Sequence, residues 1–415
     1  MRKTLPFTKK EIEDIIRKYP TPFYIYDEKG IRKRAREFLK SFSILPGFKN
    51  YFAVKACPNP YILKILREEK MGVDCSSLPE LVMAEKVGFK GEEIMFSSNN
   101  TPPGEFKKAR ELGAIINLDD ISFIEDLERE AGIPKLVCLR YNPGEVKKIG
   151  KNPIGKPKEA KFGMTKEQVF SALKILREKG AKRFALHTMV VSNELREEVL
   201  SGIAKLMFEL ALEVKKRIGI EVEFINLGGG IGIPYRENEK EVDFKKLAQR
   251  IFKFYQTILL KNNLSSKIVM ECGRTITGPF GFLITKVIHK KHTYKDYIGV
   301  DTSVAHLIRP AMYGAYHHIT VLGKEKKRKT KIYDVVGSLC ENNDKLAINR
   351  RLPKIEINDI LVIHNAGAHS FAMSFNYNGK LRPKELLLRE RGKVEEIRRA
   401  ETIKDYFATL DFSKL

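Results

Sequence analysis

The segment INLGGGIGIPY (225–235) has the residue types that bind an anion. Gly228, Gly229 and Gly230 follow an apolar stretch, and three glycines there let backbone N–H groups approach a phosphate closely. A tight turn would explain the same glycines equally well. The segment is not followed by the helix and the acidic residue of a dinucleotide fingerprint, so the sequence argues against NAD as the ligand.

A second segment, ECGRTITGPFG (271–281), combines opposite charges around a glycine. Glu271 and Arg274 stand three residues apart, with Gly273 between them. The spacing suits a carboxylate that faces one chemical group and a guanidinium that faces a phosphate. A surface ion pair is the simpler interpretation of this segment when it is taken alone.

A lysine and a cysteine complete the candidate chemistry. Lys55 lies in YFAVKACPNP at the end of an apolar stretch, where a lysine is expensive to bury. Cys340 stands beside Glu341 in GSLCENND (337–344). Taken singly, Lys55 is most simply a side chain that reaches the solvent, and Cys340 is most simply a buried structural thiol.

The first two-thirds of the chain alternate short apolar strands with amphipathic helices. The strand candidates are β-rich or continuously apolar, as strands buried on both faces should be. They cover residues 49–56, 72–77, 93–98, 114–119, 135–142, 183–190, 223–230 and 267–273. Eight such units predict an α/β fold, a TIM-type (β/α)8 barrel, in preference to a doubly wound sheet. Polar and glycine residues stand at the carboxyl ends of these strands, the face on which barrel enzymes place their chemistry.

After about residue 280 the pattern changes to strands with only short helices between them. The strand-like segments cover 280–291, 296–302, 317–324, 331–338, 359–367 and 385–394. We therefore expect the barrel over 28–280 and a mostly-β C-terminal domain over 281–415. The segment 1–27 contains a further strand, FYIYD (23–27), which stands apart from the barrel series and could join the β-domain.

Composition excludes several classes of protein. Hydrophobic residues make up 43% and charged residues 31%, which is typical of soluble globular proteins. The first residues lack the apolar run of a signal peptide, and no stretch approaches the roughly 20 apolar residues of a membrane span. The five cysteines show no metal-ligand spacing, which favours a reducing, cytoplasmic compartment.

The chain is strongly basic, with 76 Lys and Arg against 52 Asp and Glu and a formal net charge of +24. Its basic run KEKKRKTK (324–331) has no interleaved aromatic residues and no nucleic-acid motif. We interpret the excess as a Lys-rich solvated surface and expect neither nucleic acid nor a membrane as partner. We expect histidines such as His292 and His318 to lack carboxylate partners, and hence expect no metal site.

Taken together, the segments resemble the fold-type III pyridoxal-phosphate decarboxylases, the family of ornithine, arginine and diaminopimelate decarboxylases. FAVKA, NLGGG, ECGR, RPAMYGAYH, CENND and GA…MSFNYNGKLRP match the family's motifs in order and in approximate spacing, nearly from end to end. RPAMYGAYHHI and NYNGKLRPKELLL are most similar to diaminopimelate decarboxylase. The resemblance implies an alanine racemase-like barrel, pyridoxal 5'-phosphate as cofactor and a small amino acid as substrate.

The resemblance also implies roles for the motifs. Lys55 would hold the cofactor covalently, and Glu271 would keep the ring nitrogen protonated so that the ring withdraws electrons strongly. Alanine racemase has an arginine against that nitrogen, so the glutamate favours decarboxylation. Cys340 would deliver a proton to the substrate carbon after CO2 leaves. The other cofactor-binding residues shared with the family would be Ser192, Gly228, Gly229, Gly230, Gly273 and Arg274.

Arg309 and Tyr313, in IRPAMY, and Glu341 match the family's substrate contacts, and Arg274 is expected to contact the substrate too. A guanidinium and a carboxylate suit the distal carboxylate and ammonium of diaminopimelate, whereas ornithine has no distal carboxylate. In this family Cys340 and Glu341 reach the active site from the neighbouring subunit. The resemblance therefore implies a homodimer with shared active sites.

Two residues depart from the family's pattern. The family's HxHxGS motif reads LHTMVVSN here, so Met189 replaces the histidine that stacks on the cofactor ring, while His187 and Ser192 remain. A thioether can pack against a ring face but cannot carry charge. His369, in GAH, stands where the family has a tyrosine that contacts cofactor and substrate, and its imidazole could donate a similar hydrogen bond.

The leading hypothesis is decarboxylation of meso-2,6-diaminopimelate to L-lysine. The alternatives are a decarboxylase for another amino acid (carboxynorspermidine, ornithine or arginine) and a non-catalytic regulatory relative. Retention of both Lys55 and Cys340 argues against the non-catalytic relative, which needs neither. Asp74 in GVDCSS and Arg140 in LRYNP match the family's pattern as well.

Overall fold

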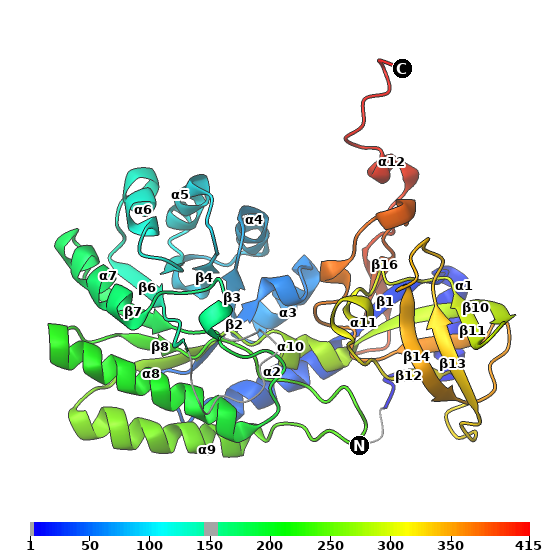
Figure 1. Cartoon of the computed structure of the whole chain (residues 1–415), viewed down its shortest axis with the longest axis horizontal. Helices are drawn as coiled ribbons and strands as arrows, with labels where there is room; N and C mark the ends of the chain where they lie inside the picture. The colour runs from blue at the N-terminus through cyan, green and yellow to red at the C-terminus, as the bar shows by residue number, and fades with distance from the viewer. Residues whose placement is uncertain (1–3, 145–156) are drawn as a thin grey trace. The chain divides into compact units, whose positions relative to one another are not determined.

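The computed structural model describes residues 4–144 and 157–415 (Figure 1). The chain forms two compact units. The first comprises residues 32–233 and 241–276, and the second comprises 1–31, 234–240 and 277–415. The short segment 234–240 thus belongs with the β-rich unit, although it lies inside the range expected for the barrel.

The first unit is a closed barrel of eight parallel strands. The strands are β2 (Lys49–Ala53), β3 (Gly72–Cys75), β4 (Ile94–Ser97), β5 (Ile115–Leu118), β6 (Leu136–Arg140), β7 (Arg183–His187), β8 (Phe224–Asn226) and β9 (Lys267–Met270). All eight lie within the ranges predicted from the sequence, so the predicted barrel is confirmed. Each strand stops one to four residues short of its predicted end.

Helices follow the strands and surround the barrel (Figure 1). They are α3 (Pro60–Glu68), α4 (Leu78–Val87), α5 (Pro103–Glu111), α6 (Phe123–Ala131), α7 (Lys166–Glu178), α8 (Glu197–Ile218), α9 (Phe244–Phe254) and α10 (Arg274–Thr277), with α2 (Glu28–Phe42) before the first strand. Local signals set their starts: Asn59 caps α3, and Thr165 and Gln168 form a capping box at α7.

One cluster of buried side chains draws on nearly every strand of the barrel. Its members are Tyr51, Met95, Ile115, Leu136, Cys138, Ala185, Phe224 and Val269. Only the inside of a closed barrel brings residues from β2 and from β4 through β9 into one cluster. Packed side chains thus fill this part of the barrel, which leaves the strand ends for chemistry.

The second unit is a mostly-β domain around one sheet. The path of hydrogen-bonded strands is β14-β13-β11-β10-β1-β16-β17; β15 also pairs with β10, and β12 pairs with β15. Its elements are α1 (Lys9–Lys18), β1 (Phe23–Asp27), β10 (Gly281–His292), β11 (Asp296–Val300), α11 (Arg309–Tyr313), β12 (Ile319–Val321), β13 (Lys331–Val336), β14 (Lys345–Leu352), β15 (Ile360–Ile363), β16 (Lys384–Leu388), β17 (Val394–Arg398) and α12 (Ile403–Tyr406). The strand FYIYD is β1, which pairs antiparallel with β10 and parallel with β16.

Two details of this sheet differ from the sequence-based expectation. The strand β14 was not predicted, because its sequence KLAINRRL is rich in polar and charged residues. The single expected strand over 385–394 is wrong, since β16 ends at Leu388 and a turn leads to β17. The backbone N–H of Arg389 donates to the carbonyl of Lys393 and closes that turn.

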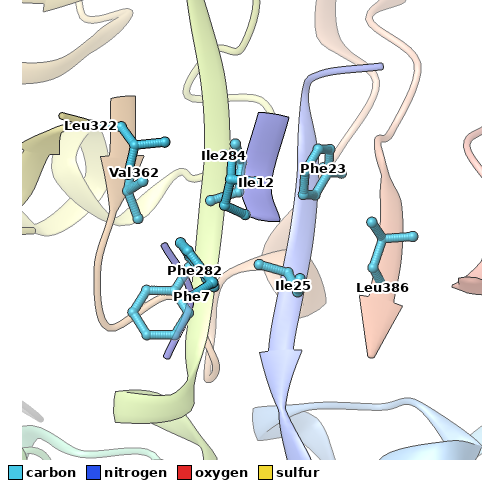
Figure 2. Packing of buried hydrophobic residues seen from close by; sticks show 9 residues of the cluster. All are labelled: Phe7, Ile12, Phe23, Ile25, Phe282, Ile284, Leu322, Val362 and Leu386. Atoms are coloured by element: carbon cyan, nitrogen blue, oxygen red, sulfur yellow. The ribbon is translucent and has the colours of Figure 1, made fainter. Parts of the chain in front are cut away.

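Apolar side chains fix helix α1 against this sheet, as Figure 2 shows. The cluster consists of Phe7, Ile12, Phe23, Ile25, Phe282, Ile284, Leu322, Val362 and Leu386. These residues come from both ends of the chain and from its C-terminal third. The N-terminal segment is therefore part of the core of this unit.

Candidate active site

The barrel strands carry buried polar side chains at or beside their last residues. These are Asp74 on β3, Ser97 on β4, Asn117 on β5, Arg140 on β6, His187 on β7 and Asn226 on β8, and Glu271 directly follows β9. The carboxyl ends of parallel barrel strands open on one face, so these side chains belong to that face. Buried polar groups are costly unless they are hydrogen-bonded, and hydrogen bonds link most of these residues into one network.

Glu271 is the centre of this network. Its Oε1 accepts a hydrogen bond from Asn226 Nδ2 at 2.7 Å and another from Ser97 Oγ at 3.2 Å. Its Oε2 lies 3.1 Å from His187 Nε2. Burial alone would raise the pKa of Glu271, but His187, Lys55 and the hydrogen bond from Asn226 lower it to about 2. The carboxylate is therefore ionised at every pH at which the protein would work.

His187 is oriented by Asn117. The amide nitrogen Nδ2 of Asn117 lies 2.8 Å from His187 Nδ1 and donates to Ser97 Oγ at 3.1 Å. This contact leaves the other ring nitrogen, Nε2, to face the negative charge of Glu271 at 3.1 Å.

Lys55 lies just beyond the end of β2, in the short 3-10 turn Val54–Ala56, and its side chain is exposed. Its positive charge acts to lower the pKa of both Asp74 and Glu271. Burial nevertheless raises the pKa of Asp74 well above its usual value, and the charge of Glu271 adds to that shift. Two neighbouring carboxyl groups thus differ in charge, Asp74 favouring the protonated form and Glu271 the ionised form.

The glycine segment after β8 runs close to other backbone. A β-carbon at Gly228 would lie 2.2 Å from the carbonyl oxygen of Thr188, and one at Gly229 would lie 2.6 Å from that of Glu271. Gly228 and Gly230 also have positive φ angles, of 69° and 90°. No other residue type fits these positions without movement of the chain.

Three further expected cofactor residues lie in this barrel unit. A β-carbon at Gly273 would lie 2.7 Å from the β-carbon of Ala56, so the turn after β9 packs against the turn that carries Lys55. Arg274 begins α10 and, like Ser192 beyond β7, is half-buried. The structure therefore brings Lys55, Glu271, Gly273 and the three-glycine segment to one end of the barrel.

Met189 takes part in the glycine segment directly. Its side chain is half-buried, and its Sδ accepts a hydrogen bond from the backbone N–H of Gly229 at 3.2 Å. Asn226 Oδ1 accepts a second hydrogen bond, from Gly228 N at 2.9 Å. The thioether thus contacts the backbone that is expected to hold a phosphate.

Arg140 contacts a carboxylate and an aromatic ring. Its Nη1 lies 3.0 Å from Asp119 Oδ1, which also accepts a hydrogen bond from Asn99 Nδ2 at 2.6 Å. Its guanidinium lies 4.6 Å from the ring centroid of Phe162. These contacts tie the ends of β5 and β6 together.

The remaining expected site residues lie in the β-rich unit. Arg309 begins α11 and is buried, with only 7% of its surface exposed, whereas Tyr313 at the end of this helix is 62% exposed. His369 is half-buried and has a positive φ angle of 52°.

Cys340 and Glu341 are exposed, on the loop between β13 and β14. Two side chains hold the backbone of this loop. Asn378 Oδ1 accepts a hydrogen bond from Cys340 N at 2.7 Å, and Asp344 Oδ2 accepts one from Leu339 N at 2.8 Å. The interpretation of Cys340 as a buried structural thiol is therefore wrong; the other four cysteines, Cys57, Cys75, Cys138 and Cys272, are buried.

Two histidines have carboxylate neighbours that the sequence did not suggest. His292 Nδ1 lies 2.6 Å from Asp296 Oδ1, and His318 Nδ1 lies 3.4 Å from Glu237 Oε1. The expectation that they lack such partners is wrong.

Over residues 4–144 and 157–415, no group of three or more His, Cys, Asp or Glu could hold a metal ion. In the same residues, no helix has the length and apolar character needed to cross a membrane.

Sequence reasoning did not single out Ser97, Asn117 or Asn226 as site residues. The signal that could have found them is shared: each is a polar residue in the last positions of an otherwise apolar strand. In a barrel, such residues point to the face where the strands end.

Comparison with known proteins identifies the chemistry of this barrel end. The family model for the pyridoxal-binding domain of pyridoxal-dependent decarboxylases matches residues 28–278. Protein TabA of Pseudomonas amygdali pv. tabaci is 40% identical over 396 residues, which cover 95% of this chain and 92% of that protein. The diaminopimelate decarboxylase of Methanothermobacter thermautotrophicus is 34% identical over 389 residues, covering 93% and 91% of the two chains.

Solved structures agree with this relationship. Diaminopimelate decarboxylase from M. jannaschii in co-complex with L-lysine has a TM-score of 0.89 at 29% identity, covering 96% of this chain and 94% of that one. The Helicobacter pylori enzyme complexed with L-lysine has a TM-score of 0.88 at 28% identity, covering 97% and 100%. The fold, the lysine and the glutamate at the barrel end, and the relatives all agree. The chain therefore belongs to the pyridoxal-dependent decarboxylases.

Proposed function

We propose that this decarboxylase converts meso-2,6-diaminopimelate to L-lysine, with pyridoxal 5'-phosphate held on Lys55. The observation that carries the proposal is the negative charge of buried Glu271. Glu271 is a buried carboxylate that its neighbours keep ionised, and Lys55 lies close enough to contribute to that effect. A carboxylate of this kind keeps a pyridine nitrogen protonated, which is what a decarboxylase requires of its cofactor.

The barrel residues fit the cofactor. At Gly229 and Gly230 a β-carbon would lie 2.6 Å and 2.4 Å from backbone carbonyl oxygens, so only bare backbone can line this segment. Bare backbone N–H groups at a strand end are well suited to a phosphate. Among the described residues, the buried Oδ1 of Asp74 has no hydrogen-bond partner, which leaves a polar atom for a bound group to satisfy.

When bound, pyridoxal phosphate accepts the electron pair that departing CO2 leaves behind. Lys55 would hold the cofactor through its amine. Glu271 holds the proton on the ring nitrogen, and His187 with Asn226 keeps the carboxylate in position. Met189 would help to hold the cofactor in place of the family's histidine, and His369 would offer a hydrogen bond where related enzymes use a tyrosine.

The substrate contacts belong to the β-rich unit. Arg309 supplies a guanidinium for the distal carboxylate, Glu341 a carboxylate for the distal ammonium, and Tyr313 a further hydrogen bond. Cys340 returns a proton to the α-carbon after CO2 has left. The thiol's exposure on the loop before β14 suits a residue that completes the active site of a neighbouring subunit in a homodimer.

A decarboxylase for another amino acid is the second candidate. Met189 favours it, because this thioether contacts the glycine segment where related enzymes have a histidine. The 40% identity to Protein TabA, a relative that carries a different name from the diaminopimelate decarboxylases, points in the same direction.

Release of CO2 from a panel of amino acids separates the two candidates. We expect meso-diaminopimelate to exceed L-lysine, L-ornithine and L-arginine in kcat/KM by about two to four decades, because these three leave the buried guanidinium of Arg309 without its carboxylate. Arg309→Ala should erase most of this preference and leave the cofactor bound. Comparable turnover of ornithine and diaminopimelate by the unmodified enzyme would favour the second candidate and reject the first.

A further inference from the structure

Arg309 is held by two side chains, Tyr235 and His317, that lie in the quoted motifs but were given no role there. Its guanidinium lies 4.7 Å from the ring centroid of Tyr235, which belongs to the segment 234–240. Its Nη1 lies 3.2 Å from His317 Nε2. The rings of Tyr235 and His317 meet edge to face, with centroids 5.2 Å apart. Arg309, Tyr235 and His317 thus form one packed group inside the β-rich unit.

The contacts of His317 determine its protonation. Its Nδ1 lies 2.9 Å from the carbonyl oxygen of His364, and a carbonyl only accepts, so Nδ1 carries a proton. Its Nε2 faces Arg309, whose guanidinium only donates, so Nε2 must offer a lone pair. Both contacts are satisfied by the neutral imidazole with its proton on Nδ1 and by no other form.

The surroundings of His317 keep this ring in place. The residue is fully buried, and its backbone carbonyl accepts a hydrogen bond from Arg350 Nη1 at 2.7 Å. Arg350 in turn lies over the ring of Tyr316, 3.9 Å from its centroid. The neighbouring His318 faces Glu237 at 3.4 Å. Positive charges from Arg309 and Arg350 on two sides favour a neutral imidazole.

We propose that His317 is a positioning residue for substrate recognition: its neutral imidazole fixes the guanidinium of Arg309 in the direction that a substrate's distal carboxylate requires. The inference rests on the proposed function, in which Arg309 binds that carboxylate. An arginine side chain has several rotatable bonds, so an acceptor at one nitrogen and a ring against its face remove much of its freedom before the substrate arrives. The guanidinium is then already ordered when the carboxylate arrives.

Two substitutions separate the acceptor role from simple packing. His317→Phe keeps the size of the ring and removes the acceptor, while His317→Gln places an amide oxygen near the position of Nε2 and keeps it. We expect His317→Phe to raise the KM for meso-diaminopimelate about tenfold to a hundredfold with kcat within about twofold, because a hydrogen bond to a charged group contributes to binding alone. His317→Gln should stay within about threefold of the unmodified enzyme.

His364→Phe is the matched control. This neighbouring buried histidine uses its side-chain Nε2 to contact Thr320 Oγ1 at 2.8 Å, and its substitution leaves the backbone carbonyl that His317 needs. We expect a lower melting temperature for this variant and an unchanged KM. Equal effects of the Phe substitutions at 317 and 364 on KM would contradict the inference.

A double-mutant cycle with Arg309→Ala completes the test. If His317 acts through Arg309, His317→Phe should change the KM less than about twofold once Arg309 has been removed. If the unmodified enzyme decarboxylates diaminopimelate but the two substitutions raise the KM additively, the inference is overturned and the proposed function stays intact. Absence of diaminopimelate turnover in the unmodified enzyme would overturn the proposed function, and the inference with it.

Discussion

At the scale of single residues, the barrel end places two carboxyl groups in opposite states. Glu271 lies among hydrogen-bond donors and positive charge, and its pKa falls to about 2 in spite of burial. Asp74 is buried beside that negative charge, and its pKa rises well above the usual value. One group therefore keeps a negative charge at the site, and the other keeps a proton.

Glu271→Gln tests the charge directly. We expect kcat to fall about a hundredfold to a thousandfold with the cofactor still bound, because a neutral amide cannot hold the ring nitrogen protonated. Steady-state kinetics and the cofactor's absorption measure the two effects. Ser97→Ala is the control, since it removes only the 3.2 Å hydrogen bond to Oε1 and should cost less than about tenfold. A Gln variant as active as the Ala variant would mean that the charge is not needed.

Ionisation of the two carboxyl groups should also change the stability of the folded protein in opposite directions. The lowered pKa of Glu271 means that its stabilising effect is present above the ordinary value of 4.5 and lost as the pH falls toward 2. The raised pKa of Asp74 means that this group destabilises the folded protein only as the pH rises above 3.8. In cofactor-free protein at pH 7, we therefore expect Asp74→Asn to stabilise and Glu271→Gln to destabilise, each by about 1–3 kcal/mol.

Urea unfolding at pH 7 and at pH 4 measures these differences. Both effects should be smaller at the lower pH, because pH 4 lies below the ordinary pKa of 4.5 for Glu271 and close to that of 3.8 for Asp74, so the unfolded chain is then partly protonated at both groups. A stabilising effect of Asp74→Asn that grows on acidification would contradict the assignment of its proton.

The sequence could predict Lys55, Glu271 and the three glycines because each stands in a motif that is recognisable by itself. It could not predict the hydrogen-bonded partners of Glu271. Ser97, Asn117 and Asn226 lie in three different strands, and nothing in a local stretch of sequence says which polar residues a closed barrel brings together. Only the closure of the barrel determines which of these polar residues meet.

At the scale of elements, the turn after β8 depends on backbone clearance. Gly229→Ala would place a β-carbon 2.6 Å from the carbonyl oxygen of Glu271, so the turn must move. We expect the dissociation constant of the cofactor to rise at least about tenfold, as for the loss of one good hydrogen bond. Titration of the cofactor-free protein with pyridoxal phosphate measures it.

Gly202→Ala is the matched control for this prediction. Gly202 lies inside α8, and a β-carbon there would meet no atom within 4 Å. Alanine should therefore stabilise the helix by up to about 1 kcal/mol without a change in cofactor affinity. Equal affinities in the two variants would show that clearance at Gly229 is unimportant.

The elements themselves were predictable to different degrees. The barrel strands are continuously apolar and were all found, because both of their faces are buried. The strand β14 was missed, since Ile348, Asn349 and Arg351 are exposed along it and only a few positions, such as Leu346 and Leu352, are buried. An edge strand with a solvated face carries little apolar signal.

At the scale of the whole molecule, the proposed homodimer makes a prediction of its own. If Cys340 completes the site of the partner subunit, mixing inactive Lys55→Ala and Cys340→Ala proteins should restore activity, because each mixed dimer contains one intact site. About a quarter of the unmodified activity is expected after full random exchange of equal amounts. Activity after mixing, with subunit exchange verified by native mass spectrometry, is the measurement. No recovery would mean that each site is built within one chain.

The amine that holds the cofactor can be identified directly. Borohydride reduction of the purified holoenzyme should fix pyridoxal phosphate covalently to a lysine, and peptide mapping by mass spectrometry then identifies that lysine. We expect one modified peptide, which contains YFAVKACPNP with Lys55 as the labelled residue, and no label in Lys55→Ala protein. A label on any other lysine, or an unlabelled Lys55 in active enzyme, would contradict this expectation.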